Sequence, residues 1–163
     1  MDKSEYRKAL GSFMTGVTVV SAFDKGDAPW GVTANSFTSV SLEPAIVLVC
    51  IGKAGRTYPT FVEANHFAIN ILAADQQEFT SHFASQSENR FETVEWNRIE
   101  DGAPLLNDTT AWFDCRVHNR IDAGSHEILM GEVLRFAQSD NVPLGYCGGQ
   151  FVHPQPLKET QYD

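Results

Sequence analysis

The sequence predicts a mainly β fold, in which short antiparallel strands form one sheet or barrel and helices flank it. Three observations support this prediction. Runs rich in β-forming residues, separated by turn residues, recur from residue 17 to residue 51, as expected for antiparallel strands joined by short turns. Two longer runs of this kind occupy residues 112–120 and 127–136. Helical spacing of apolar residues is found only in short stretches near residues 10 and 80.

The first element is expected to be a helix. Its apolar residues stand at i, i+3, i+4 and i+7, and they are Tyr6, Ala9, Leu10 and Phe13. This spacing places them on one stripe of the helix, and Gly16 follows as a stop signal. An apolar stripe needs a partner, so we expect this helix to lie against something larger.

Four strands and a second helix are predicted next. The strands fall at residues 17–23, 30–37, 45–51 and 67–72. The first two are separated by a turn sequence at residues 24–27. Asp75 followed by Glu78 resembles a capping box, which predicts the start of a helix carrying Phe79 and Phe83 on one side.

The second half of the chain alternates between a polar segment and long strands. Residues 85–110 are polar and rich in turn residues, which predicts an excursion from the barrel that acts as a mobile lid. In the strand that follows, the residues from Phe113 to Val117 alternate between apolar and polar. This alternation predicts a buried face and a wet face, with Asp114 on the wet one.

Length and composition exclude several classes of protein. The 163 residues, 42% of them hydrophobic, suffice for one domain spanning residues 1–163, with an irregular tail at 154–163. The 12 basic and 21 acidic residues give a net charge of −9, which repels phosphate backbones and argues against nucleic-acid binding. No apolar run is long enough to span a membrane, and the N-terminus is charged from residue 2. We therefore expect neither a membrane segment nor a secretory signal.

The motif search is mostly negative. Cys50, Cys115 and Cys147 are isolated from one another, which fits the reducing cytoplasm. The five histidines are scattered, so no metal site is expected. The glycines near the C-terminus do not form the G-x-G-x-x-G pattern, and no P-loop is present. A Rossmann fold is therefore not expected.

One stretch stands apart by its polarity. Six hydroxyl or amide side chains lie within residues 31–41, where a strand would otherwise be apolar. They form either a solvated strand face with hydroxyl-backbone turns or the lining of a flat ligand site. Flavins suit such a lining, because small polar groups and backbone N–H groups bind them with little formal charge.

Several short motifs, taken in their order along the chain, resemble the flavin reductase-like family of split-barrel flavoproteins. The F-x-T-G-V motif begins at Phe13, and the hydroxyl-rich stretch follows it. A G-D-H-like motif ends at His126, with Ser125 in the place of the aspartate. Further matches fall at residues 44–50, 67–72, 83–84, 90–91, 111–113, 143–146 and 150–151. Each piece is weak alone, but their order and spacing together make the resemblance strong.

The resemblance implies a Greek-key FMN-binding split β-barrel that forms a homodimer and holds the flavin near the subunit interface. It implies a reductase that moves a hydride from a nicotinamide dinucleotide to FMN or FAD and supplies a partner monooxygenase. Related reductases often carry basic residues where Cys147 and two glycines stand here, so NADH is expected rather than NADPH. Two alternatives stay open: a split-barrel protein that binds flavin or haem without catalysis, and an oxidase of a small substrate such as a pyridoxine phosphate.

The resemblance also assigns the cofactor contacts. By position, the flavin would be contacted by Thr33, Ala34, Asn35, Ser36, Ser39 and Ser41. Cys50 and Ile51 would offer backbone groups to it. Arg56 and Thr57 would bind its phosphate, since an arginine fork and a hydroxyl suit a phosphate dianion; the alternative for Arg56 is an exposed surface charge.

The remaining candidates lie farther along the chain. Asn70 and Phe83 would flank the ring or the dimer contact, or else belong to the core. Arg90 would steer the NADH pyrophosphate. His126 is the candidate catalytic residue, because an imidazole beside the nicotinamide can hydrogen-bond the dinucleotide; a histidine satisfied by backbone at a strand end is the alternative. Ser125 keeps the hydrogen-bonding capacity of the motif but removes a charge.

Overall fold

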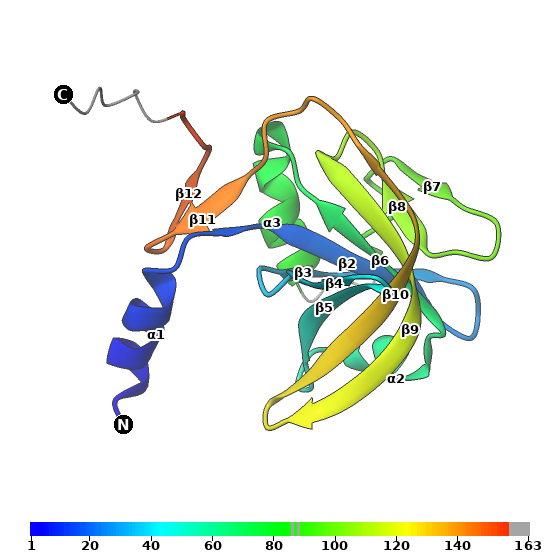
Figure 1. Ribbon diagram of the computed structural model, residues 1–163, viewed down its shortest axis with the longest axis horizontal. Helices are drawn as coiled ribbons and strands as arrows, with labels where there is room; N and C mark the ends of the chain where they lie inside the picture. The colour runs from blue at the N-terminus through cyan, green and yellow to red at the C-terminus, as the bar shows by residue number, and fades with distance from the viewer. Residues whose placement is uncertain (86, 88, 157–163) are drawn as a thin grey trace.

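Seven strands form one antiparallel sheet that curls into an open barrel (Figure 1). The computed structural model describes residues 1–85, 87 and 89–156. The strand order across the sheet is β3-β2-β6-β9-β10-β5-β4. Its strands are β2 (Thr18–Phe23), β3 (Pro29–Ala34), β4 (Thr38–Leu42), β5 (Ala45–Gly52), β6 (His66–Ile71), β9 (Ala111–Ala123) and β10 (His126–Gln138). The predicted mainly β fold is confirmed.

Smaller elements surround the barrel. A three-stranded sheet and a two-stranded sheet are formed by β1 (Thr15–Gly16), β11 (Gly145–Cys147) and β12 (Gln150–Val152), and by β7 (Trp96–Arg98) and β8 (Pro104–Leu106). The helices are α1 (Lys3–Gly11), α2 (Tyr58–Glu63), α3 (Gln77–Ala84) and the 3₁₀ turn Ala74–Gln76. Both predicted helices and the four predicted strands are therefore present, although the strand expected at 30–37 ends at Ala34.

The sheet curls because its two edge strands are consecutive in sequence. β3 and β4 stand at opposite edges, yet only residues 35–37 join them. In a flat sheet of seven strands the edges would lie about 29 Å apart. The link from the end of β3 to the start of β4 reaches roughly 14 Å when extended. The edges must therefore approach each other, and the barrel is split where they part.

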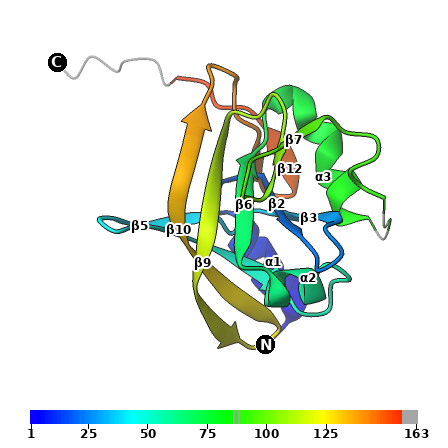
Figure 2. The ribbon, with the colours of Figure 1, turned by 90° about the vertical axis from the view of Figure 1, so that its right-hand side faces the viewer.

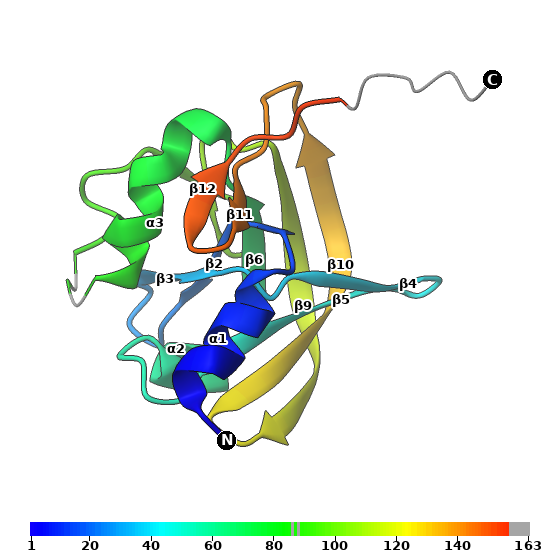
Figure 3. The same cartoon turned by 90° about the vertical axis from the view of Figure 1, so that its left-hand side faces the viewer.

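The β4–β5 hairpin extends away from the barrel (Figures 2 and 3). Its turn contains a cis peptide bond before Pro44. Val40 and Leu42 on β4 are 46% and 95% exposed. The hairpin thus offers apolar side chains that this single chain does not cover.

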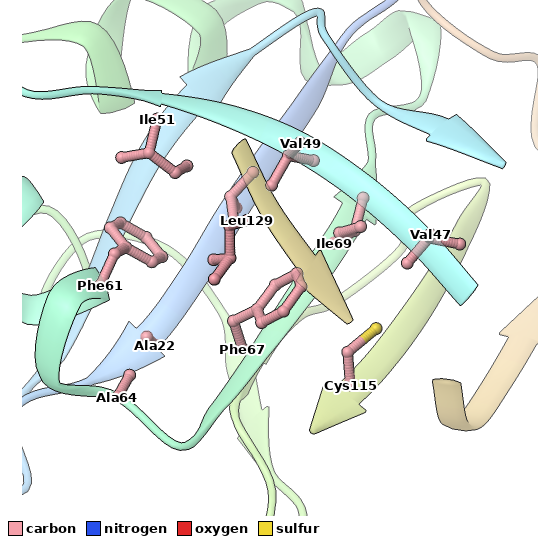
Figure 4. Packing of buried hydrophobic residues seen from close by; sticks show 11 residues of the cluster. Ala22, Val47, Val49, Ile51, Phe61, Ala64, Phe67, Ile69, Cys115 and Leu129 are labelled. Carbon is pink, nitrogen blue, oxygen red and sulfur yellow. The ribbon is translucent and has the colours of Figure 1, made fainter. Parts of the chain in front are cut away.

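The main core fills the curl of the sheet. Every second residue of β5, from Val47 to Ile51, points inward and is buried, as strand geometry requires. Phe61 of α2, Phe67 of β6 and Leu129 of β10 meet in the centre of this cluster (Figure 4). Helix α2 therefore closes one end of the barrel by contributing an aromatic ring.

Gly131 lets β10 pass close to this core. A β-bulge interrupts the pairing of β9 and β10 between Met130 and Gly131. A Cβ at Gly131 would lie 2.5 Å from Cζ of Phe67 and 2.7 Å from Cβ of Cys115. No side chain fits at these distances, so the strand crossing requires glycine.

The excursion predicted at 85–110 is present, since β7 and β8 form a separate two-stranded sheet, but its polar character is wrong for the residues that the structure describes. Phe91 and Leu106 are buried in a second core cluster with Phe83 of α3, and Leu105 belongs to a third. A few apolar residues, widely spaced among polar ones, anchor this segment against the barrel. Sequence composition underestimates such anchoring because each apolar residue is locally isolated.

The prediction for Asp114 is also wrong, because this residue is completely buried. Its carboxylate accepts hydrogen bonds from the backbone N–H of Ala103 at 3.0 Å and from the Arg135 guanidinium at 2.6 and 3.0 Å. Burial of a carboxylate is tolerated when it is paired and hydrogen-bonded in this way. Asp114 therefore ties the segment before β8 to β9 and β10.

Helix α1 contains no buried residue and stands beside the barrel rather than on it (Figures 1 and 3). Tyr6, Leu10 and Phe13 are 49%, 57% and 78% exposed. The sequence predicts that this apolar stripe packs against a larger body. The barrel of the same chain is not that body. Within the described residues, no helix has the length and apolar character needed to cross a membrane.

We predict that Gly131→Ala lowers the free energy of unfolding by about 1–3 kcal/mol, because the added methyl group overpacks the core. Urea denaturation measures this change. Gly16→Ala is the matched control, since a Cβ there meets nothing within 4 Å. An unchanged urea midpoint for the Gly131 variant would contradict the close crossing of β10 over Phe67.

Candidate functional site

The candidate site begins at the split between β3 and β4. β4 pairs with β5 from Thr38 opposite Leu48 onward. Before Thr38, the Ser36 hydroxyl replaces this backbone pairing, because it accepts a hydrogen bond from the backbone N–H of Cys50 at 2.9 Å. The loop of residues 35–37 is therefore held to β5 by a side chain.

A cavity of about 740 Å³ lies against this loop. One wall is formed by residues 35–38, and another by Tyr146, Gly148 and Gly149 of the β11–β12 hairpin. Helix α1 supplies the third wall. Three segments that are distant in sequence thus share one cavity.

A second cavity of about 370 Å³ adjoins it and shares Asn35 and Tyr146 with it. Thr33 and Ala34 line this second cavity together with Val17, Thr80, Ser81 and Phe151. The rings of Tyr146 and Phe151 lie 5.5 Å apart. The Thr33 hydroxyl donates a hydrogen bond to the Thr80 carbonyl at 2.7 Å, which attaches α3 to β3.

His126 lies on β10, on the side of β5 opposite to β4. It is the first residue of β10, it is exposed, and it pairs with Gly52 of β5. Its Nδ1 lies 2.9 Å from the Ser125 hydroxyl. Because Cys50 contacts Ser36 and Gly52 pairs with His126, the last residues of β5 bring the polar loop and the imidazole to the same strand end.

The turn before His126 is fixed to the loop after β5. The backbone N–H of Lys53 donates to the Ser125 carbonyl at 3.0 Å, and the Lys53 ammonium lies 2.5 Å from the Asp122 carboxylate. Hydrogen bonding between them raises the pKa of Lys53 and lowers the pKa of Asp122. These contacts orient the backbone that carries the imidazole.

The other residues expected to contact flavin are divided between several places. Ser39 and Ser41 lie on the extended β4 strand and are not among the residues lining the two cavities. The Cys50 N–H is already bonded to Ser36, and the Ile51 side chain is in the core. The polar stretch therefore contributes to the cavities mainly through Asn35 and its neighbours.

The two expected phosphate ligands lie in the loop after β5. Arg56 is exposed, whereas Thr57 is buried at the start of α2. Arg56 is near enough to Arg90 for its positive charge to act on that side chain.

The structure gives Arg90 a structural role. Its side chain is almost fully buried, and its guanidinium donates to the carbonyls of Gly31 at 2.6 Å, of Phe83 and Ser87 at 3.0 Å, and of Ser85. Burial, followed by the charge of Arg56, lowers its pKa. With the guanidinium committed to backbone oxygens, we do not retain the expected contact of Arg90 with a pyrophosphate.

Asn70 and Phe83 are core residues, the alternative that the sequence left open. The Asn70 amide donates to the Val19 carbonyl and the Ser21 hydroxyl, both at 3.0 Å, and its Oδ1 accepts from the N–H of Leu106 at 2.9 Å. Both side chains are fully buried. Neither can flank a bound ring in this arrangement.

The cavities fit an aromatic ring system with hydroxyl-bearing substituents. Their volumes are in the range of small-molecule sites. Their walls combine aromatic faces with the hydroxyls and amide of residues 33–38. Thr15 also lines the larger cavity, and its hydroxyl is buried without a hydrogen-bond partner among the described residues. Such a group is satisfied when a ligand supplies the partner.

Sequence reasoning missed the contributions of α1, Thr80 and Ser81 to these cavities. The motif matches did mark Thr15, Tyr146 and Phe151. The signal for the rest is absent from local sequence, because β1 joins the site only through its pairing with β11. That pairing joins residues more than a hundred positions apart in the chain.

Together the curled antiparallel sheet, the polar split and the adjoining cavities define a split-barrel flavoprotein. The chain matches the flavin reductase like domain over residues 10–154 and belongs to that family.

Two relatives illustrate the similarity. The chain is 44% identical over 154 residues to a probable flavin reductase of Rhizobium meliloti (strain 1021), covering 94% of this chain and 50% of that protein. It is 44% identical over 146 residues to the FMN reductase (NADH) SmoA of Agrobacterium fabrum, covering 90% of this chain and 83% of that protein. The chain therefore spans half the length of the first relative and most of the second.

A solved structure extends the comparison. The NADH:FAD oxidoreductase SgcE6 of Streptomyces globisporus C-1027, in complex with NAD and FAD fragments, superposes with a TM-score of 0.89 at 36% identity. The match covers 99% of this chain and 96% of that one.

We predict that Arg90→Gln lowers the free energy of unfolding by about 2–4 kcal/mol, because it removes several buried charge-assisted hydrogen bonds. Arg116→Gln is the control, since Arg116 forms an exposed ion pair with Glu132 and such pairs contribute little. Both are compared by urea denaturation. A stable Arg90 variant with a raised KM for NADH would instead restore the pyrophosphate role.

Proposed function

We propose that this chain is a flavin reductase that transfers a hydride from NADH to FMN or FAD. The observation that carries the proposal is the polar split with its two adjoining cavities, which share Asn35 and Tyr146. Two ligand-sized spaces in contact suit a reaction in which two ring systems must stack. Relatives named as an FMN reductase (NADH) and an NADH-dependent FAD reductase support a catalytic role over mere flavin or haem storage.

The chemistry asks the protein mainly for positioning. A bound flavin supplies the hydride acceptor, N5, and the nicotinamide supplies the hydride from C4 when the two atoms are about 3–3.5 Å apart. The hydroxyls and amide of residues 33–38 orient the flavin by hydrogen bonds. Tyr146 and Phe151 provide apolar walls that exclude water. No nucleophile is required for this reaction.

His126 is proposed to orient the dinucleotide rather than to move a proton. Its Nδ1 is engaged with Ser125, which leaves Nε2 to face a ligand over Gly52. Gly52 lies beside this imidazole, since a Cβ built on it would be 3.6 Å from Nε2 of His126. A hydrogen bond from this ring to the nicotinamide amide would fix the reacting face.

The reduced flavin is proposed to pass to a separate monooxygenase. Relatives at 44% and 47% identity are named as the reductase subunit of stachydrine N-demethylase and the reductase component of trigonelline monooxygenase. The chain spans 66% and 48% of those proteins. We also propose a cytoplasmic location, which the three free cysteines support.

We propose further that the chain forms a homodimer. An aromatic row leads from the cavity to the surface: Phe37 lines the cavity and lies 5.5 Å from Phe113, which stacks on Phe136 at 6.3 Å. Phe136 is 70% exposed, and Leu42 on the β4–β5 hairpin is 95% exposed. Apolar exposure of this extent marks an interaction surface, and a second copy would cover it beside the site.

The activity is tested by following NADH oxidation at 340 nm with added FMN or FAD. We expect flavin-dependent oxidation by the wild-type protein and a KM for NADH raised about tenfold in His126→Ala, since one hydrogen bond to the dinucleotide is lost. Flavin affinity should stay unchanged. His118→Ala, which removes another exposed histidine, is the control. Oxidation no faster than without protein would refute the proposal.

The dimer is tested by sedimentation equilibrium. We expect a dimer for the wild-type chain, and a dissociation constant at least about tenfold higher for Phe136→Glu, because a charge would be buried at the centre of the interface. Val142→Glu alters another half-exposed apolar residue and should leave the dimer intact. A monomeric wild-type protein at micromolar concentration would exclude this assembly.

A further inference from the structure

Helix α1 turns its basic face toward the larger cavity. Ser4, Arg7, Lys8 and Gly11 stand at i, i+3, i+4 and i+7 and all line that cavity. This spacing defines one face of a helix. The face opposes the polar loop of residues 35–38 across the cavity.

Helix α1 differs from an ordinary surface helix, because none of its residues is buried. Such a helix turns its apolar stripe to the protein and its charges to water. Tyr6 and Leu10 of α1, and Phe13 just after it, are 49%, 57% and 78% exposed, although the last two border the cavity. The basic face thus looks onto a cavity rather than onto open solvent alone.

The cavity is also positive in an acidic protein. The chain has 21 acidic and 12 basic residues, yet none of the described residues that line this cavity is Asp or Glu. The Lys8 ammonium is already paired with the Glu5 carboxylate at 2.9 Å, so Arg7 is the charge available to a ligand. The Arg7 side chain forms no hydrogen bond or ion pair within residues 1–85, 87 and 89–156.

Two further features favour an anionic ligand here. The buried Thr15 hydroxyl lines the cavity and has no hydrogen-bond partner among the described residues. The backbone N–H of Gly148 donates to the Gly11 carbonyl at 2.7 Å, which ties the end of α1 to the β11–β12 hairpin above it (Figures 1 and 3). That bond holds the basic face in place over the cavity.

We propose that Arg7, assisted by the Thr15 hydroxyl, binds a phosphate group of one of the two nucleotide ligands. The guanidinium fork suits two phosphate oxygens at once. The phosphate belongs either to the flavin or to the pyrophosphate of the dinucleotide. This inference rests on the proposed reductase function, and it places the phosphate recognition on α1 instead of Arg90.

The test compares Arg7→Gln with Lys3→Gln. Both variants remove one positive charge from α1, but Lys3 is not among the residues that line the cavity. Since α1 has no buried residue, neither change should affect folding, which circular dichroism verifies. Flavin binding is measured by fluorescence quenching with FMN and with riboflavin, which lacks the phosphate. The KM is measured for NADH and for 1-benzyl-1,4-dihydronicotinamide, a hydride donor without phosphate.

We expect Arg7→Gln to weaken one phosphate-bearing ligand about tenfold, the effect of losing a charge-assisted hydrogen bond, and to leave its phosphate-free counterpart unchanged. A loss confined to FMN assigns the flavin phosphate, and a loss confined to NADH assigns the pyrophosphate. Equal losses with phosphate-free ligands, no loss at all, or the same loss in Lys3→Gln would overturn the proposal. The binding comparison needs no turnover, so a failure of the reductase activity itself would be recognised separately.

Discussion

The short link between β3 and β4 is the constraint on which the rest of the structure depends. Residues 35–37 connect the two edges of a seven-stranded sheet, so the sheet has to curl until its edges meet. Beyond Leu48, β5 is no longer paired with β4. The Ser36 hydroxyl takes the place of β4 at Cys50. The hydroxyl-rich sequence is therefore needed both to close the barrel and to line the site.

The molecule separates its structural charges from its candidate binding groups. The buried guanidinium of Arg90 holds backbone carbonyls around Gly31 and the end of α3, and buried Asp114 with Arg135 joins β9, β10 and the segment before β8. Apart from Arg7 and Lys8 of α1 at the larger cavity, the walls of the cavities carry hydroxyls, an amide and aromatic rings. Neutral groups can be removed from water by a flat ligand at far lower cost than charged ones, which suits a site that must stack two rings.

Periodicity and turn residues predicted six of the seven strands of the main sheet and helices α1 and α3, because these signals act over a few neighbouring residues. Two interpretations failed for the same physical reason. Asp114 lies at a position that alternation assigns to solvent. Its burial is stabilised by hydrogen bonds from Arg135, which β10 places beside it. Phe91 and Leu106 are isolated among polar residues in the sequence, and their common cluster forms only when α3 packs beside them.

The sequence by itself determined the class of fold, the family and the polar character of residues 33–38, since these follow from local pattern and from motifs in a fixed order. Only the tertiary structure decided which candidates meet. It placed Asn70, Phe83 and Arg90 in the scaffold and brought α1 to the cavity through the pairing of β1 with β11. Such pairing joins distant parts of the chain by backbone hydrogen bonds, which any residue can make, so it leaves little trace in the side chains that a sequence displays.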